Sequence, residues 1–169
     1  MLALTLVSIL WTFSFGIIKD SLSGLDANFV AFMRLLLSFL VLLPFLRPQR
    51  IPGKIRISLA IIGALQFGLM YATYIQAFRY LQAYEVALFT IFTPIYVTII
   101  DDLFNRRFDP LTFLLAALAV AGTGFVQYGK PIESRWFTGF LLVQGSNVSF
   151  ALGQVLYKKV LSEQPELKD

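Results

Sequence analysis

A run of 44 mostly apolar residues, from Ile57 to Ile100, constrains this chain more than any other feature of its sequence. Only two charged residues, Arg79 and Glu85, interrupt the run. A single helix of that length would be ~66 Å long at ~1.5 Å per residue, about twice the ~30 Å thickness of the hydrocarbon in a bilayer. The run therefore predicts two membrane helices that turn back near Arg79, Gln82 and Glu85 and form a tight antiparallel hairpin at one membrane face.

The composition excludes several classes of protein. Hydrophobic residues make up 57% of the chain and charged residues 14%, whereas about a quarter of a soluble domain is charged. The sequence contains no cysteine and no histidine, so it offers no disulfide framework, no thiolate metal site and not the commonest general base. We therefore expect an all-α integral membrane protein, a multi-pass helical bundle, with no cofactor, no metal and no catalytic residue.

Six apolar segments follow one another, each close to the ~20 residues that cross a bilayer as a helix. The first lacks a basic start and a small-residue cleavage site, so we expect a retained membrane helix, with a signal anchor as the alternative. Asp26 and Asp109 occupy expected N-cap positions, and Pro110 an expected first helical position. The six predicted spans are Leu2–Ile18, Ala27–Leu46, Ile57–Phe78, Leu81–Ile100, Leu111–Tyr128 and Phe137–Tyr157.

The basic residues predict the orientation of these spans. With the N-terminus in the cytoplasm, nine basic residues lie on the cytoplasmic side and four on the opposite side, while Arg34 lies within a helix. Cytoplasmic connectors are enriched in Lys and Arg, so we expect both termini in the cytoplasm and the protein in the inner (plasma) membrane. The same distribution accounts for the formal charge of +4, so we expect no nucleic-acid partner.

Polar and aromatic side chains form stripes along the predicted helices. Such stripes commonly face the interior of a membrane bundle, because a polar group in lipid is costly. Glu85 is the candidate for proton coupling, and Pro94 is the candidate helix kink. The candidate substrate-pathway residues are Trp11, Arg34, Tyr71, Tyr74, Thr93, Gln144 and Asn147.

Each stripe also has a structural interpretation. Aromatic residues such as Tyr71 and Tyr74 often pack helices or lie at the membrane interface. Gln144 and Asn147 can simply join helices, and Arg34 can extend to the membrane surface.

The charged residues near helix ends have structural interpretations too. Glu85 is favoured near a helix start by the helix dipole alone, and this interpretation outweighs proton coupling. We expect Lys19 to be a solvated helix end. We expect the same of Asp101 and Asp102, because two arginines follow closely and favour a helix end over a metal site.

Pro94 lies in the middle of the fourth predicted span and removes one backbone donor. We expect this to free the carbonyl of Thr90, which the hydroxyl of Thr90 or Thr93 would help to satisfy. The kink then serves packing, or it provides a hinge or a carbonyl exposed to substrate.

Four stretches are informative through their order and spacing: "LWTFSFGIIK" (Leu10–Lys19), "FMRLLLSFLVLLPFL" (Phe32–Leu46), "AFRYLQAYEVALFTIFTPIYVTII" (Ala77–Ile100) and "FDPLTFLLAALAVAGTGFV" (Phe108–Val126). In this order they resemble the EamA family of the drug/metabolite transporter superfamily. The "GER"-like end of the family's fourth helix reads "NRR" here, at Asn105–Arg107.

The resemblance implies ten helices in two five-helix repeats of opposite orientation, with a central cavity and a peripheral fifth helix. Residues 1–130 would form the first repeat, and residues 131–169 the start of the second, with the sixth helix and a cytoplasmic tail. Because the sequence stops soon after the sixth helix, we expect a fragment, a truncated product or a short protein that pairs as a homodimer or with the missing second half.

The leading hypothesis is a secondary transporter, exporter or importer, of small metabolites such as amino acids, amines or carboxylates. Its partners would be a small-molecule substrate and the lipid bilayer, and the chain contains no nucleotide-binding loop. The alternative is a non-transporting remnant or an accessory membrane subunit. An integral membrane enzyme acting on lipids is less favoured, because clustered acids or histidines are missing.

Overall fold

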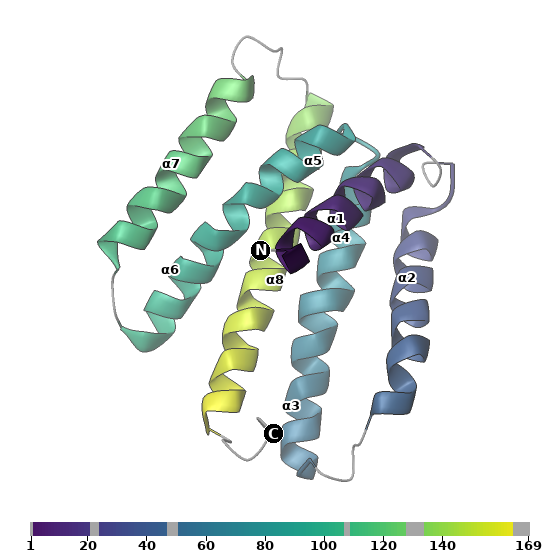
Figure 1. Cartoon of the computed structure of the whole chain (residues 1–169), viewed down its shortest axis with the longest axis vertical. Coiled ribbons are helices and arrows are strands. Elements are labelled where there is room, and N and C mark those ends of the chain that lie inside the picture. The colour runs from purple at the N-terminus through teal and green to yellow at the C-terminus, as the bar shows by residue number, and fades with distance from the viewer. Residues whose placement is uncertain (1, 21–23, 47–50, 107–108, 128–133, 164–169) are drawn as a thin grey trace.

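The computed structural model describes residues 2–20, 24–46, 51–106, 109–127 and 134–163, and all regular structure within these ranges is helical (Figure 1). A π-helical turn, η3, and two short 3-10 turns, η1 and η4, interrupt the α-helices. The elements are α1 (Leu2–Asp20), α2 (Ala27–Leu42), η1 (Leu43–Phe45), α3 (Gly53–Gly63), η3 (Ala64–Leu69), α4 (Met70–Ala77), α5 (Ala83–Phe89), η4 (Thr90–Phe92), α6 (Thr93–Asn105), α7 (Pro110–Gln127) and α8 (Ser134–Glu163).

These elements combine into rods of membrane-spanning length, which confirms the expected multi-pass helical bundle. Among the residues that the structure describes, four stretches are long and apolar enough to cross a bilayer: Ala27–Phe45, Gly53–Ala77, Ala83–Asn105 and Arg135–Glu163. Two shorter apolar helices, Thr5–Lys19 and Pro110–Gly122, accompany them.

The predicted hairpin is present. The rod α3–η3–α4 ends at Ala77, and the rod α5–η4–α6 begins at Ala83. Backbone hydrogen bonds close the turn between them, including one from the Leu81 N–H to the Ala77 carbonyl at 2.9 Å. Leu81 itself is only 1% exposed, so an apolar side chain anchors the turn from inside.

The expected caps are present as well. The Asp26 carboxylate accepts from the backbone N–H groups of Asn28 and Phe29 at the start of α2. Asp109 accepts from the backbone N–H groups of Leu111 and Thr112, and Pro110 is the first residue of α7. Helix α7 packs against α6 and η4 at the edge of the bundle (Figure 1), in the position expected for a peripheral fifth helix.

Helix α8 lies against α4 and α6 and forms the centre of the described bundle (Figure 1). Two glycines allow α8 to approach η3 and the turn between α4 and α5 closely. A Cβ on Gly153 would lie 2.3 Å from the Cβ of Gln66 in η3, and a Cβ on Gly139 would lie 2.5 Å from the Cγ of Leu81. Small residues at helix contacts are typical of membrane bundles, where packing rather than the hydrophobic effect holds helices together.

This packing predicts opposite effects for the same substitution at two sites of α8. Gly153→Ala is expected to lower the free energy of unfolding by about 1–3 kcal/mol, because the backbone of Gln66 must move. Gly145→Ala meets nothing within 4 Å and is expected to be stabilising by up to about 1 kcal/mol, since alanine favours a helix interior. Thermal unfolding of the two variants in detergent measures the difference, and equal melting temperatures would contradict this packing.

Candidate functional site

Pro94 shapes the backbone at the centre of the site. It lies in the first turn of α6, where a missing N–H is least costly. The N–H of Thr93 bonds to the carbonyl of Thr90, three residues back, and so leaves the Phe89 carbonyl without that N–H. The expectation that the Thr90 carbonyl would be freed and satisfied by hydroxyls is therefore wrong: the Thr90 hydroxyl donates to Ala87 instead, at 2.6 Å.

The Phe89 carbonyl instead accepts a hydrogen bond from α8. The Asn147 amide nitrogen donates to it at 2.8 Å and to the Gln144 side-chain oxygen at 3.3 Å. The Thr93 hydroxyl donates to the Asn147 side-chain oxygen at 3.1 Å. We call Thr93, Gln144, Asn147 and the Phe89 carbonyl the amide cluster. Three of the predicted pathway residues therefore meet in the interior, where Asn147 is 3% exposed.

Arg34 belongs to a second polar group, the arginine cluster of Ser14, Arg34 and Tyr71. One terminal nitrogen of Arg34 donates to the Ser14 hydroxyl at 3.3 Å. The guanidinium carbon lies 5.4 Å from the centre of the Tyr71 ring, within the range of a cation–π contact. Tyr74 extends this cluster, since its ring lies edge-on to Tyr71 at 6.3 Å and to Phe78 at 5.3 Å.

Both clusters contain an unsatisfied donor. Among the described residues, two buried side-chain atoms have no hydrogen-bond partner: the Nε of Arg34 and the Nε2 of Gln144. Buried polar groups are nearly always paired, so each such group calls for an explanation.

Glu85 has partners that account for its burial. Its carboxylate accepts from the backbone N–H of Gln82 at 2.8 Å and from the indole N–H of Trp136 at 3.2 Å. The first bond caps α5, as the helix-dipole interpretation anticipates, and the second attaches the first turn of α8. Proton coupling through Glu85 stays a prediction.

Trp11 lies apart from both clusters, because it is 61% exposed on α1. Sequence reasoning did not select Trp136, Ser14 or the Phe89 carbonyl. Trp136 does belong to the polar and aromatic stripe predicted on the sixth helix with Phe140 and Gln144, but the candidate pathway residues do not include it. Ser14 and the Phe89 carbonyl are brought to the site only by packing.

Lys19 corrects another expectation. Its ammonium group donates to the carbonyls of Phe78 at 2.8 Å and Leu81 at 2.9 Å, so it is not a solvated helix end. These carbonyls lie just beyond the C-terminal end of α4, where backbone acceptors lack partners within the helix and a positive charge is favourable.

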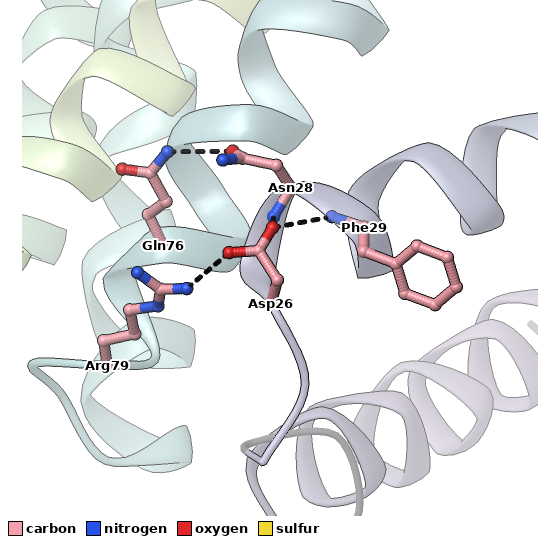
Figure 2. A network of polar contacts seen from close by, with 5 residues as sticks. All are labelled: Asp26, Asn28, Phe29, Gln76 and Arg79. Atoms are coloured by element: carbon pink, nitrogen blue, oxygen red, sulfur yellow. Dashed lines mark hydrogen bonds and ion pairs between the residues drawn. The ribbon is translucent and has the colours of Figure 1, made fainter.

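Further polar contacts hold the same turn. Arg79 pairs with Asp26 at 3.0 Å, and the Gln76 amide donates to the Asn28 side chain at 3.1 Å, so the start of α2 is attached to the end of α4 (Figure 2). Together with Lys19, we call these residues the hairpin clasp. The clasp joins α1, α2 and the α4–α5 turn at one end of the bundle.

The hairpin clasp predicts a pH dependence. The backbone N–H of Phe29, followed by that of Asn28 and by Arg79, holds the pKa of Asp26 below its ordinary value. Because the folded-state pKa is depressed, the stabilisation is present above the unfolded value of about 3.9 and is lost as the pH falls through the folded value. We expect Asp26→Ala to lower the melting temperature near pH 7 more than Asp26→Asn, which keeps a cap acceptor. Thermal unfolding against pH measures this, and identical curves for the two variants would contradict the cap.

The opposite end of the bundle carries two acidic residues and a cleft. Asp101 pairs with Lys158 at 3.0 Å, and Asp102 accepts from the backbone N–H of Asp109. These acids therefore join helices rather than only ending one. A cleft of about 560 Å³ beside them is also lined by Gln66 and Tyr157. Within the described ranges, no group of acidic side chains could hold a metal ion.

The helices are long enough to span a membrane, and the interior of the bundle carries amides, a cation and aromatic rings. This combination is typical of membrane transporters. Residues 1–128 match the EamA-like transporter family. The chain belongs to this family, which confirms the predicted resemblance and favours a transporter over a membrane enzyme.

Curated relatives extend the similarity through α8. The protein of Pseudomonas aeruginosa named "Probable biotin transporter" is 40% identical over 163 residues, which are 96% of this chain and 57% of that protein. The proteins named "Biotin transporter" in Salmonella typhimurium and Escherichia coli (strain K12) are each 39% identical over 167 residues, which are 98% of this chain and 56% of theirs. The chain thus spans little more than half the length of these relatives. No solved structure matches it with significance.

Proposed function

We propose that this chain forms the substrate-binding part of a secondary transporter for biotin. The observation that carries the proposal is the guanidinium of Arg34, which is set within the helices and has one buried nitrogen without a partner in the described part of the chain. A cation held within a bilayer is costly unless it pairs or serves a transported solute. A carboxylate is the natural partner, because guanidinium and carboxylate form strong charge-assisted hydrogen bonds.

The names of the curated relatives indicate that the solute carrying the carboxylate is biotin. Biotin has a carboxylate on a flexible chain, two compact fused rings and a cyclic urea. Rings of Tyr71, Tyr74, Phe89, Trp136 and Phe140 lie near the two polar clusters. These features suit an amphipathic solute whose rings require apolar contact and whose ends require hydrogen bonds.

The remaining features of the transporter belong to this proposal. Residues 1–130 act as the first repeat and residues 131–169 as the start of the second, with both termini in the cytoplasm and further helices or a second copy closing the cavity. The continuous match to longer relatives supports a second half over a homodimer. Many exposed large apolar side chains of α1 and α2, such as Phe13 and Phe39, then face lipid or those further helices.

Uptake of radiolabelled biotin tests the proposal. The protein at its full natural length would be produced in a biotin-requiring bacterium that lacks its own biotin uptake. Saturable uptake that excess unlabelled biotin inhibits, above the level of an empty vector, is the expected result. Normal amounts of protein in the membrane without uptake would exclude biotin and favour the remnant or accessory subunit.

A further inference from the structure

We infer that the amide nitrogen of Gln144 binds an uncharged carbonyl oxygen of the transported solute, which in biotin is the urea oxygen. This inference rests on the proposed function and assigns the two ends of the solute to different clusters. The charged donor, Arg34, takes the carboxylate, and the neutral donor, Gln144, takes the carbonyl.

The Phe89 carbonyl determines the direction of the hydrogen bonds in the amide cluster. The Phe89 carbonyl can only accept, so the Asn147 nitrogen must face it, as observed at 2.8 Å. The Asn147 oxygen then faces Thr93, whose hydroxyl donates to it at 3.1 Å. Every polar atom of the Asn147 side chain is therefore engaged.

The contact with Asn147 determines the orientation of the Gln144 amide. The Asn147 nitrogen also donates to the Gln144 oxygen at 3.3 Å. Reversing the Gln144 amide would place two NH₂ groups against each other, which is unfavourable. The Gln144 nitrogen therefore has to point away from the cluster, and it is buried without an acceptor among the described residues.

The buried Gln144 nitrogen requires a hydrogen-bond acceptor. Gln144 is 8% exposed, so bulk water does not satisfy it. An unmade hydrogen bond on a buried donor is costly, and a site built to bind a substrate oxygen has this property before the substrate arrives. A neutral amide matches a neutral carbonyl, because a carboxylate is better served by the guanidinium.

The surroundings of Gln144 fit the ring that carries such a carbonyl. Trp136, Phe140 and Gln144 follow one face of α8 at spacings of four residues. The Trp136 and Phe140 rings are stacked with centres 5.7 Å apart, and Phe89 meets both edge-on. We call these three rings the aromatic wall. Phe89 is 2% exposed and lies behind the other two rings, so a compact ring would be placed against the partly buried Trp136 and Phe140, with its carbonyl toward the next turn of α8, where Gln144 lies.

The test uses inhibition of radiolabelled biotin uptake by two analogues. In 2-iminobiotin a protonated imine replaces the urea oxygen, so the ring has no acceptor. Desthiobiotin keeps the urea and lacks sulfur, and serves as the matched analogue. For the natural full-length protein we expect 2-iminobiotin to inhibit about tenfold less well than desthiobiotin, the usual scale for one lost hydrogen bond in a recognition site.

Substitutions of Gln144 are expected to change the ratio of the inhibition constants of 2-iminobiotin and desthiobiotin. Gln144→Leu and the similarly shaped Gln144→Met are expected to weaken inhibition by desthiobiotin more than inhibition by 2-iminobiotin and so to reduce the difference between the two inhibition constants, because neither side chain donates to the urea oxygen. Gln144→Glu is expected to favour 2-iminobiotin, since a carboxylate accepts from the cationic ring. Gln154→Leu, an exposed glutamine of the same helix, is the control that keeps the ratio of the unmodified protein.

The outcomes separate the two proposals. Absence of biotin uptake by the unmodified protein would refute the proposed function. Biotin uptake with an unchanged analogue ratio in Gln144→Met and Gln144→Glu would overturn the inference alone and show that the nitrogen pairs with a protein group. Amounts of each variant in the membrane are measured beside uptake, so that a folding defect in Gln144→Leu leaves the other two variants to decide.

Discussion

Substitution of Asn147 by leucine is expected to reduce biotin uptake about twentyfold or more while the protein remains in the membrane. The change removes three hydrogen bonds, to Phe89, Gln144 and Thr93. Two of these bonds cross between helices, where such bonds average about 0.6 kcal/mol each, and the buried Phe89 carbonyl also loses its side-chain donor, which costs about 1–3 kcal/mol. These losses disorder the amide cluster without unfolding a bundle held by apolar packing.

The measurement is the initial rate of labelled biotin uptake, divided by the amount of protein in the membrane. Asn105→Leu, at the exposed end of α6, is the matched control and is expected to keep normal uptake. Normal uptake by the Asn147→Leu protein would show that the amide cluster is not part of the transport site.

Substitution of Arg34 by leucine is expected to have the larger effect, a loss of uptake of about thirtyfold to several thousandfold. Removing one member of a desolvated charge pair typically costs about 2–5 kcal/mol, and here the other member is the carboxylate of the solute. Arg34→Lys keeps the charge but loses the planar group that bonds to Ser14 and lies over Tyr71. We expect this variant to retain partial uptake, because a lysine is a poor substitute at a stacked site.

Inhibition by biotinamide, which lacks the carboxylate, identifies the reason for the loss. The unmodified protein should prefer biotin to biotinamide, and Arg34→Leu should lose that preference. Arg56→Leu, an exposed arginine of α3, is the control. A preserved preference in Arg34→Leu would show that Arg34 supports the fold and does not contact the carboxylate.

The sequence left two roles open for its buried polar residues, support of the fold and contact with substrate. Hydrogen-bond partners in the structure distinguish these two roles. Glu85 has two hydrogen bonds that attach its own helix start and Trp136, so a structural role accounts for its burial. Arg34 and Gln144 each retain one buried donor without a partner among the residues that the structure describes. A group with unused bonding capacity inside the bundle is a better candidate for contact with substrate than a group whose bonds are complete.

The sequence alone determined the class of the protein and the arrangement of its helices. Too few charges for a water-exposed surface indicated a membrane bundle. The length of the apolar run required a turn near Arg79, and Asp26 and Asp109 marked helix starts, since an N-cap depends on residues only two or three positions away. Helical periodicity also placed Gln144 and Asn147 on one face.

Only the tertiary structure decided which groups become partners. Nothing in the local sequence of Lys19 indicates that it reaches carbonyls about sixty residues away. The Phe89 carbonyl became available through a backbone turn beside Pro94, and Asn147 reached it from α8. The unpaired nitrogen of Gln144 follows from that contact, because the direction of each hydrogen bond depends on the one before it. Periodicity specifies the face of a helix, whereas hydrogen-bond partners depend on the packing of helices that are distant in sequence.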